Sequence, residues 1–181
     1  MNKELKTERL LLLPGDNERD NTPFLKMLRQ DGDFRLFSGV DPTEKNILEF
    51  QNYFEKKQCC LYAIFLKDRP EEMIGYAGIS YRGEERTEAE FYISKPYRNN
   101  GYCTEALNKV CEEAFQGNLN CPVIDKLNAT TISANLAAVR VLEKCGFSKN
   151  TEIAFCLQVL VDPDDEDVVY DNEVSEYERK K

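Results

Sequence analysis

The sequence contains no histidine, and this absence removes several kinds of chemistry at once. Cys-His pairs and Ser-His-Asp triads both need an imidazole as general base, so nucleophilic catalysis of those types is excluded. A structural zinc site would have to use four cysteines, yet no Cys-x-x-Cys pair supplies the usual ligand spacing. Acid-base chemistry must therefore use carboxylates, tyrosine, thiols, lysine or water, and we expect no metal.

Basic residues and long apolar runs are also scarce. Lys and Arg number 24 against 33 Asp and Glu, and the net charge of −9 argues against a nucleic-acid surface, because phosphate contacts need a basic patch. No apolar run approaches the roughly 20 residues that span a bilayer, and Leu10 to Leu13 is too short for a signal peptide. Seven scattered cysteines form no disulfide framework. We expect a reduced, cytoplasmic protein that binds neither nucleic acid nor membrane.

Length and charge distribution indicate a single unit with one distinctive end. At 181 residues, 41% of them hydrophobic, the chain is long enough for one buried core and short for two, so we expect one domain over residues 1–181. Residues 161–181 contain nine acidic and three basic side chains, which gives −6 of the net −9. Around the turn DPDDED we expect an acidic C-terminal β-hairpin at about 151–178.

The spacing of apolar residues predicts the order of helices and strands. Strands are predicted over 7–13, 59–66, 72–81, 87–94, 123–131, 151–161 and 167–178, the first of them stopped by Pro14-Gly15. Helices are predicted over 22–30 and 43–57, from 104 to a stop at Gly117, and from 135 to a stop at Gly146. This order predicts an α/β (α+β) fold with a mixed, largely antiparallel central sheet of about seven strands and about four helices.

The stretch KPYRNNGYCTEAL, from Lys95 to Leu107, joins a predicted strand to a predicted helix. A helix N-terminus carries unpaired N–H groups and the positive end of the helix dipole, so it attracts anions. Arg98 adds a charged donor, Gly101 lets the backbone approach a ligand, and Pro96 closes the strand without needing an N–H. These features suit a pyrophosphate, and a solvated turn is the alternative, because the stretch matches neither the Walker A nor the dinucleotide pattern.

Three segments together resemble a known family. YRNNGY followed by CTEAL resembles the Arg/Gln-x-x-Gly-x-Gly/Ala acetyl-CoA loop of the GNAT N-acetyltransferase superfamily. NLAAVRVLEKCGF resembles that superfamily's later helix, and TERLLLLP resembles the start of its RimJ/RimL-like branch, which acetylates protein N-termini. The resemblance implies a GNAT-like fold and an acetyl-CoA-dependent transferase that moves an acetyl group directly to a primary amine.

The resemblance also implies the residues that bind the cofactor. Backbone N–H groups of one loop would hold the CoA pyrophosphate: Arg98, Asn99, Asn100, Gly101, Tyr102, Cys103 and Thr104. The strand containing Phe91 and Ile93 would pair its backbone with the pantetheine arm. Asn135 would hydrogen-bond the cofactor, although it is equally suited to be a helix N-cap. Cys103 stands where the family has Gly or Ala, and it is small enough to permit close approach.

The resemblance places the candidate base, a carboxylate, on the strand before the loop. Alternation puts Glu88, Glu90 and Tyr92 on one face and Ala89, Phe91 and Ile93 on the other. Family similarity favours Glu88, and either glutamate would deprotonate the amine through water or hold an ammonium; a solvent-facing strand edge is the alternative. The family's general-acid tyrosine falls at Leu142, which cannot donate a proton, so water or Tyr102 would have to substitute.

The acceptor amine stays open at this point. An α-amine, with a pKa near 8, loses its proton more easily than a lysine amine near 10.4, which favours a protein N-terminus or a similarly acidic small amine or polyamine. Two alternatives are a catalytically inactive CoA sensor of the same fold and an interaction protein that works through the acidic hairpin. The sequence allows a monomer or a homodimer.

Overall fold

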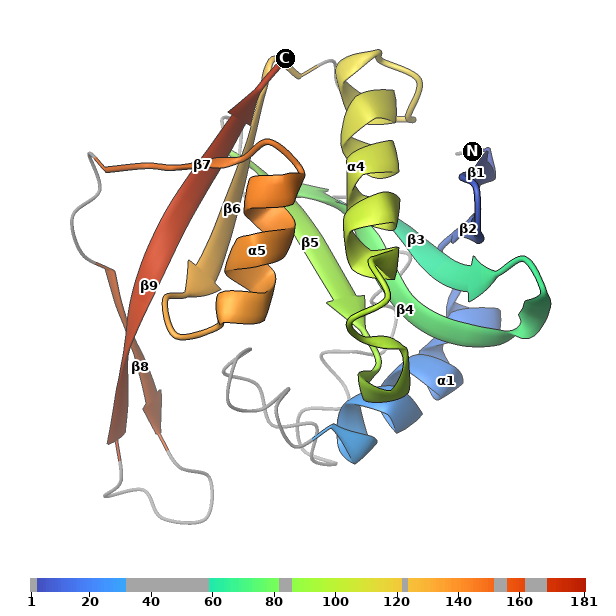
Figure 1. The fold of residues 1–181 in the computed structure, drawn as a ribbon, viewed down its shortest axis with the longest axis horizontal. Coiled ribbons are helices and arrows are strands. Elements are labelled where there is room, and N and C mark those ends of the chain that lie inside the picture. The colour runs from blue at the N-terminus through green and yellow to red at the C-terminus, as the bar shows by residue number, and fades with distance from the viewer. Residues whose placement is uncertain (1–2, 32–58, 82–85, 122–123, 152–155, 162–168) are drawn as a thin grey trace.

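The computed structural model of the protein describes residues 3–31, 59–81, 86–121, 124–151, 156–161 and 169–181 (Figure 1). In these ranges the strands are β1 Leu5–Lys6, β2 Leu10–Pro14, β3 Cys59–Leu66, β4 Arg69–Tyr81, β5 Thr87–Ile93, β6 Lys126–Ile132, β7 Ser148–Lys149, β8 Cys156–Val161 and β9 Val169–Lys180. The helices are α1 Asn17–Gln30, α4 Tyr102–Phe115 and α5 Leu136–Lys144, with a 3₁₀ turn, η2, at Lys95–Tyr97.

All the strands belong to one sheet. Its order is β1-β2-β3-β4-β5-β6-β9-β7, and β8 pairs with β9. Every neighbouring pair is antiparallel except β5 and β6, which run parallel. A meander thus forms one half of the sheet, and the two parallel strands join it to the C-terminal half.

Helices cover both faces of this sheet. α4 and α5 pack on one face, where Leu107, Val110 and Leu142 are fully buried among sheet residues. α1 packs on the other face through Phe24 and Leu28. Fully burying an aliphatic or aromatic side chain of this size stabilises the fold by about 1.5–3 kcal/mol, so these apolar faces fix where each helix sits.

The predicted fold class is confirmed, and the apolar stripe predicted for α4 is buried in full: Ala106, Leu107, Val110, Cys111, Ala114 and Phe115. The extra strands relative to prediction are the two-residue β1 and β7, which are too short to leave a pattern in the sequence. The helix predicted over 43–57 lies outside the described residues. No helix within those residues is long and apolar enough to cross a bilayer.

Two predicted boundaries near the N-terminus are wrong. The strand expected over 7–13 starts at Leu10 and includes Pro14. Pro14 has no N–H to donate, and the next hydrogen bond to β3 is made by the Gly15 N–H, which donates to the Leu61 carbonyl at 2.8 Å. The helix expected from residue 22 starts at Asn17, because the Asp16 side chain caps it by accepting from the Arg19 N–H at 2.8 Å.

Candidate active site

The sheet opens between its two parallel strands. β5 and β6 are in register only at Glu88 and Asn128, whereas β5 pairs with β4 along its whole length. Beyond that point the strands diverge toward their carboxyl ends, and the N-terminal ends of α4 and α5 lie at the same end of the sheet (Figure 1). Ligands of α/β proteins commonly bind where strand ends and helix starts meet in this way.

Peptide groups of β5 line this opening. The Ser94 N–H donates to the Ile74 carbonyl at 2.9 Å, so the Ser94 peptide points toward β4. Peptide groups alternate in direction along a strand, and those of Phe91 and Ile93 therefore point toward β6. In the described ranges β5 and β6 are in register only at Glu88 and Asn128, so these two peptide groups face the side of β5 where its pairing with β6 has ended.

The loop between β5 and α4 has two residues with left-handed backbone. Asn99 has φ 65° and Gly101, the N-cap of α4, has φ 79°. Asparagine and glycine adopt this conformation more readily than other residues, which explains why the sequence places them here. Successive turns of this kind direct several N–H groups to one side and form an anion-binding concavity.

The N–H groups of this loop are available. Among the described residues, no acceptor pairs with the successive N–H groups from Asn99 to Thr104, and intrahelical bonding resumes where Glu105 donates to the Gly101 carbonyl at 3.0 Å. These donors coincide with the positive end of the α4 dipole. The predicted pyrophosphate loop therefore has the donors that an anion requires.

Arg98 is the exception among the predicted loop residues. Its N–H donates to the Lys95 carbonyl at 3.3 Å, its Nε donates to the Ile93 carbonyl at 3.0 Å, and its Nη2 pairs with Asp31. Asp31, the buried C-cap residue of α1, also accepts from the Tyr92 hydroxyl at 2.8 Å. Burial and this hydrogen bond raise the pKa of Tyr92 above its ordinary value. Arg98 thus ties the end of β5 to α1, and its described contacts hold the loop in place.

The carboxylate predicted as base lies inside the sheet. Glu88 Oε1 accepts from Arg86 Nε at 2.8 Å and from Thr130 Oγ1 at 3.3 Å, and Arg86 Nη2 also donates to Glu176 at 2.9 Å. The Glu88 side chain is 16% exposed. An exposed strand edge does not describe this position, because β4 and β6 flank Glu88 on both sides. Glu90 is half-buried one step closer to the opening.

Comparison with known proteins gives the family. The sequence profile of the acetyltransferase (GNAT) domain matches residues 9–148. The chain belongs to the GNAT acetyltransferase family. A probable N-acetyltransferase of Bacillus subtilis (strain 168), YjcK, is 30% identical over 134 residues, which cover 72% of this chain and 69% of that protein. The predicted family is confirmed, and the protein is an acyltransferase.

Two solved GNAT structures illustrate the shared fold. RimL, a ribosomal protein α-N-acetyltransferase in complex with coenzyme A, is 13% identical with a TM-score of 0.70, and the match covers 98% of each chain. Spermidine N-acetyltransferase from Vibrio cholerae, in complex with CoA and spermine, is 14% identical with a TM-score of 0.71, and the match covers 96% of each chain. At these identities the likeness concerns the fold.

The positions where this chain departs from the GNAT pattern have structural explanations. Cys103 packs its side chain against the α4 core, where burial raises the pKa of its thiol, so the side chain does not obstruct the loop. Leu142 is fully buried in the same core, and it cannot take part in proton transfer. The Tyr102 ring lies under the Arg9 guanidinium, 4.6 Å from ring centroid to Cζ.

The alternative N-cap role of Asn135 is confirmed. Its Oδ1 accepts from the Ala138 N–H at 3.1 Å at the start of α5. This contact uses the oxygen of the amide. The cap leaves its NH₂ group to point elsewhere, so a cap and a ligand contact are compatible at this residue.

Sequence reasoning missed three residues at this end of the molecule. Asp31 anchors Arg98, and Arg9 and Glu105 form an ion pair beside the loop at 2.7 Å. Arg9 and Glu105 are 96 residues apart in the chain. Glu105 can be recognised in the sequence as an acidic residue in the first turn of α4, but no local pattern identifies Arg9 as its partner.

Proposed function

We propose that this GNAT protein uses acetyl-CoA to acetylate a primary amine by direct transfer, with the donor bound at the opening between β5 and β6. The observation that carries the proposal is the early end of β5–β6 pairing, after Glu88 and Asn128. It leaves the peptide groups of Phe91 and Ile93 facing an unpaired edge next to a loop of available N–H groups.

The available groups fit acetyl-CoA in kind and in order. The pantetheine arm contains two amides, which match the peptide groups that Phe91 and Ile93 direct at the opening. Because the Ile93 carbonyl already accepts a hydrogen bond from Arg98, Ile93 would contact the pantetheine arm mainly through its N–H group. The N–H groups from Asn99 to Thr104 would hold the pyrophosphate, as a helix N-terminus does for anions. Bound there, acetyl-CoA supplies the thioester that is to be cleaved.

A carboxylate is the group that this chain offers to the attacking amine. In direct transfer the amine nitrogen forms a C–N bond to the acetyl carbon as the C–S bond breaks, and the amine must first lose a proton. We propose that Glu88 or Glu90 accepts this proton through water, since both lie on one face of β5. Because Leu142 cannot act as an acid, water would return a proton to the leaving thiolate.

The acceptor class follows from ionisation. A peptide α-amine, with a pKa near 8, has a sizeable neutral fraction at physiological pH, roughly one fifth, whereas an alkylamine near 10.4 is almost wholly protonated. With no histidine in the chain to serve as a stronger base, we propose that amines with lower pKa react fastest. RimL and the spermidine enzyme, which acetylate a protein N-terminus and a polyamine by their names, represent the two classes to compare.

Calorimetric titration with acetyl-CoA, followed by a thiol-release assay over peptides, polyamines and small amines, tests the proposal. We expect saturable binding and thiol release with one amine class. Absence of acetyl-CoA binding by the wild-type chain would contradict the proposal.

A second candidate is a CoA-binding protein without turnover. The buried Leu142 favours it, because the family's acidic tyrosine is absent at that position. This candidate predicts tight acetyl-CoA binding with no thiol release for any amine in the panel, so the same pair of measurements separates it from the enzyme.

A further inference from the structure

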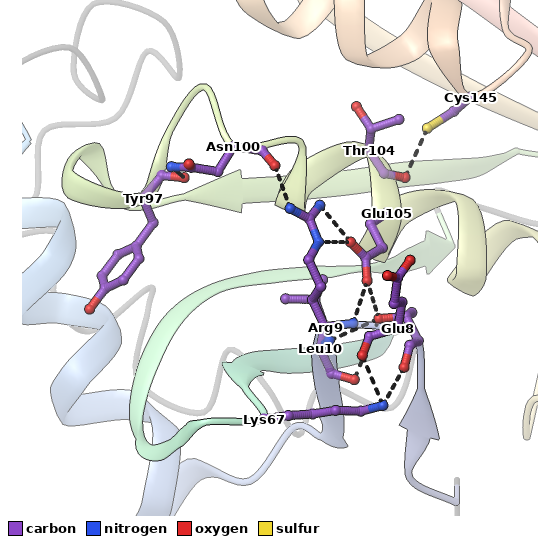
Figure 2. Close-up of polar contacts among 10 residues, drawn as sticks. Glu8, Arg9, Leu10, Lys67, Tyr97, Asn100, Thr104, Glu105 and Cys145 are labelled. Atoms are coloured by element: carbon purple, nitrogen blue, oxygen red, sulfur yellow. Dashed lines mark hydrogen bonds and ion pairs between the residues drawn. The ribbon is translucent and has the colours of Figure 1, made fainter.

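The turn between β1 and β2 contacts the first turn of α4 (Figure 2). Thr7 Oγ1 donates to Glu105 Oε1 at 2.5 Å, and the Arg9 backbone N–H donates to the same oxygen at 3.0 Å. Arg9 Nε donates to Glu105 Oε2 at 2.7 Å. Lys67 holds the turn from the other side by donating to the Glu8 carbonyl at 3.2 Å. The Glu105 carboxylate therefore fastens this turn to the helix.

Arg9 extends from this ion pair to the proposed pyrophosphate loop. Its Nη1 donates to the Asn100 carbonyl at 2.9 Å, and its guanidinium covers the Tyr102 ring. A Cβ placed on Gly101 would lie 3.4 Å from Arg9 Nη2. One side chain thus touches or approaches three consecutive residues at the start of α4.

The contact with Asn100 sets the direction of the next N–H. In a trans peptide the C=O and the following N–H point in opposite directions. Because Arg9 holds the Asn100 carbonyl, the Gly101 N–H is directed away from Arg9. The peptide plane at the N-cap cannot rotate without breaking this hydrogen bond, so the donor is fixed before a ligand arrives.

The ion pair also removes an electrostatic conflict. Burial raises the pKa of Glu105, but hydrogen bonds from Thr7 and Arg9 outweigh it and bring the pKa below its ordinary value, so the carboxylate is ionised at neutral pH. An uncompensated negative charge in the first turn of α4 would repel a phosphate bound there. Arg9 supplies the matching positive charge at 2.7 Å, and 44% of its side chain is exposed.

We propose that Arg9 is a positioning residue for the pyrophosphate of acetyl-CoA. It fixes the Asn100–Gly101 peptide and neutralises Glu105, and it does so from the N-terminal β1–β2 turn. This inference rests on the proposed function, because it takes the loop to be the pyrophosphate site.

The test compares acetyl-CoA with S-acetylpantetheine, a donor that carries the same thioester and amides and no pyrophosphate. For Arg9→Met we expect KM for acetyl-CoA to rise about tenfold or more, with kcat changed less than about twofold, as for a lost charge-assisted contact. The value of kcat/KM for S-acetylpantetheine should stay at the wild-type level. Arg9→Lys keeps the charge without the forked donors and should restore affinity only in part.

Lys6→Met is the matched control. It removes a positive charge from the same segment, but Lys6 pairs with the exposed Glu4 at 2.7 Å, and none of its described contacts is with α4. We expect this variant to keep wild-type kinetics with both donors. Thermal melting of each variant shows whether it is folded, and Arg9→Lys carries the comparison if Arg9→Met does not fold.

The outcomes separate this inference from the proposed function. If the wild-type chain does not bind acetyl-CoA, the proposed function fails. Suppose that the wild type binds and turns over. If a folded Arg9 variant then loses activity equally with both donors, or keeps full activity with both, Arg9 does not act through the pyrophosphate and the inference is overturned.

Discussion

At the scale of single residues, the contacts of Glu88 bear on its proposed role as the base. Arg86 pairs with it at 2.8 Å and with Glu176 at 2.9 Å, so one guanidinium is shared by two carboxylates. A shared partner neutralises less of the Glu88 charge than a dedicated ion pair would. A charged group in this position suits either removal of a proton from an amine or attraction of an ammonium.

Replacing this carboxylate gives the first prediction. Glu88→Gln should lower kcat by about 10²–10⁴-fold with its true acceptor, since that is the usual contribution of a general base. Glu176→Gln is the control. Glu176 lies on β9 and shares Arg86 with Glu88, so this variant disturbs the same guanidinium and should keep most activity. Full turnover in both Glu88→Gln and Glu90→Gln would show that no carboxylate of β5 serves as base.

A second residue-scale prediction concerns thiol reactivity. The pKa of Cys121 is lowered to about 6, chiefly because its interaction with the Cys60 thiol outweighs burial. The thiolate is the reactive form, so alkylation by iodoacetamide should rise with pH around a midpoint near 6 and level off above about pH 7. Burial raises the pKa of the other thiols with resolved shifts: Cys103, Cys111 and Cys145.

Mass-spectrometric peptide mapping after brief labelling measures this order of reactivity. Cys60→Ala removes the largest interaction that lowers the pKa of Cys121 and should move the midpoint to higher pH. Labelling of Cys111 or Cys145 before Cys121 at pH 7 would contradict this order of reactivity.

At the scale of elements, the start of α4 depends on the backbone conformation of Gly101. A β-branched residue at φ 79° is strained, so Gly101→Val should weaken acetyl-CoA binding about tenfold or more while far-UV circular dichroism stays unchanged. Gly101→Asn is the matched variant, because asparagine tolerates this region, as Asn99 does at φ 65°. It should bind within about threefold of wild type. Undiminished binding by Gly101→Val would contradict the placement of the pyrophosphate.

Elements with local signals could be predicted from the sequence. Gly101 and the apolar stripe from Ala106 to Phe115 identify the loop and helix α4, because turn chemistry and helical periodicity are local properties. The divergence of β5 from β6 was not predicted, since it depends on where pairing stops between strands far apart in the chain. The Arg9–Glu105 and Arg98–Asp31 ion pairs could not be predicted for the same reason, because their partners are far apart in the chain.

At the scale of the whole molecule, binding at a site that joins several elements should stabilise the fold. With acetyl-CoA at 100 times its Kd, the free energy of unfolding should rise by about 2.7 kcal/mol. For a chain of this length, that corresponds to a rise in Tm of about 5–10 °C. Differential scanning fluorimetry measures the shift, and Gly101→Val, with acetyl-CoA bound about tenfold more weakly or worse, should show about half of it or less at the same ligand concentration. No shift in the wild type at saturation would contradict native-state binding.

The unpaired edges within the sheet also bear on aggregation. Exposed strand edges recruit other chains, and proteins normally cover them or place charges along them. Here the two open edges face each other, because β5 and β6 are neighbours in one sheet and are joined at Glu88 and Asn128. A strand of another molecule would have to enter the opening between β5 and β6 from its wide end to pair with them. If the opening binds the pantetheine arm as proposed, the same arrangement keeps these peptide groups from pairing with strands of neighbouring molecules.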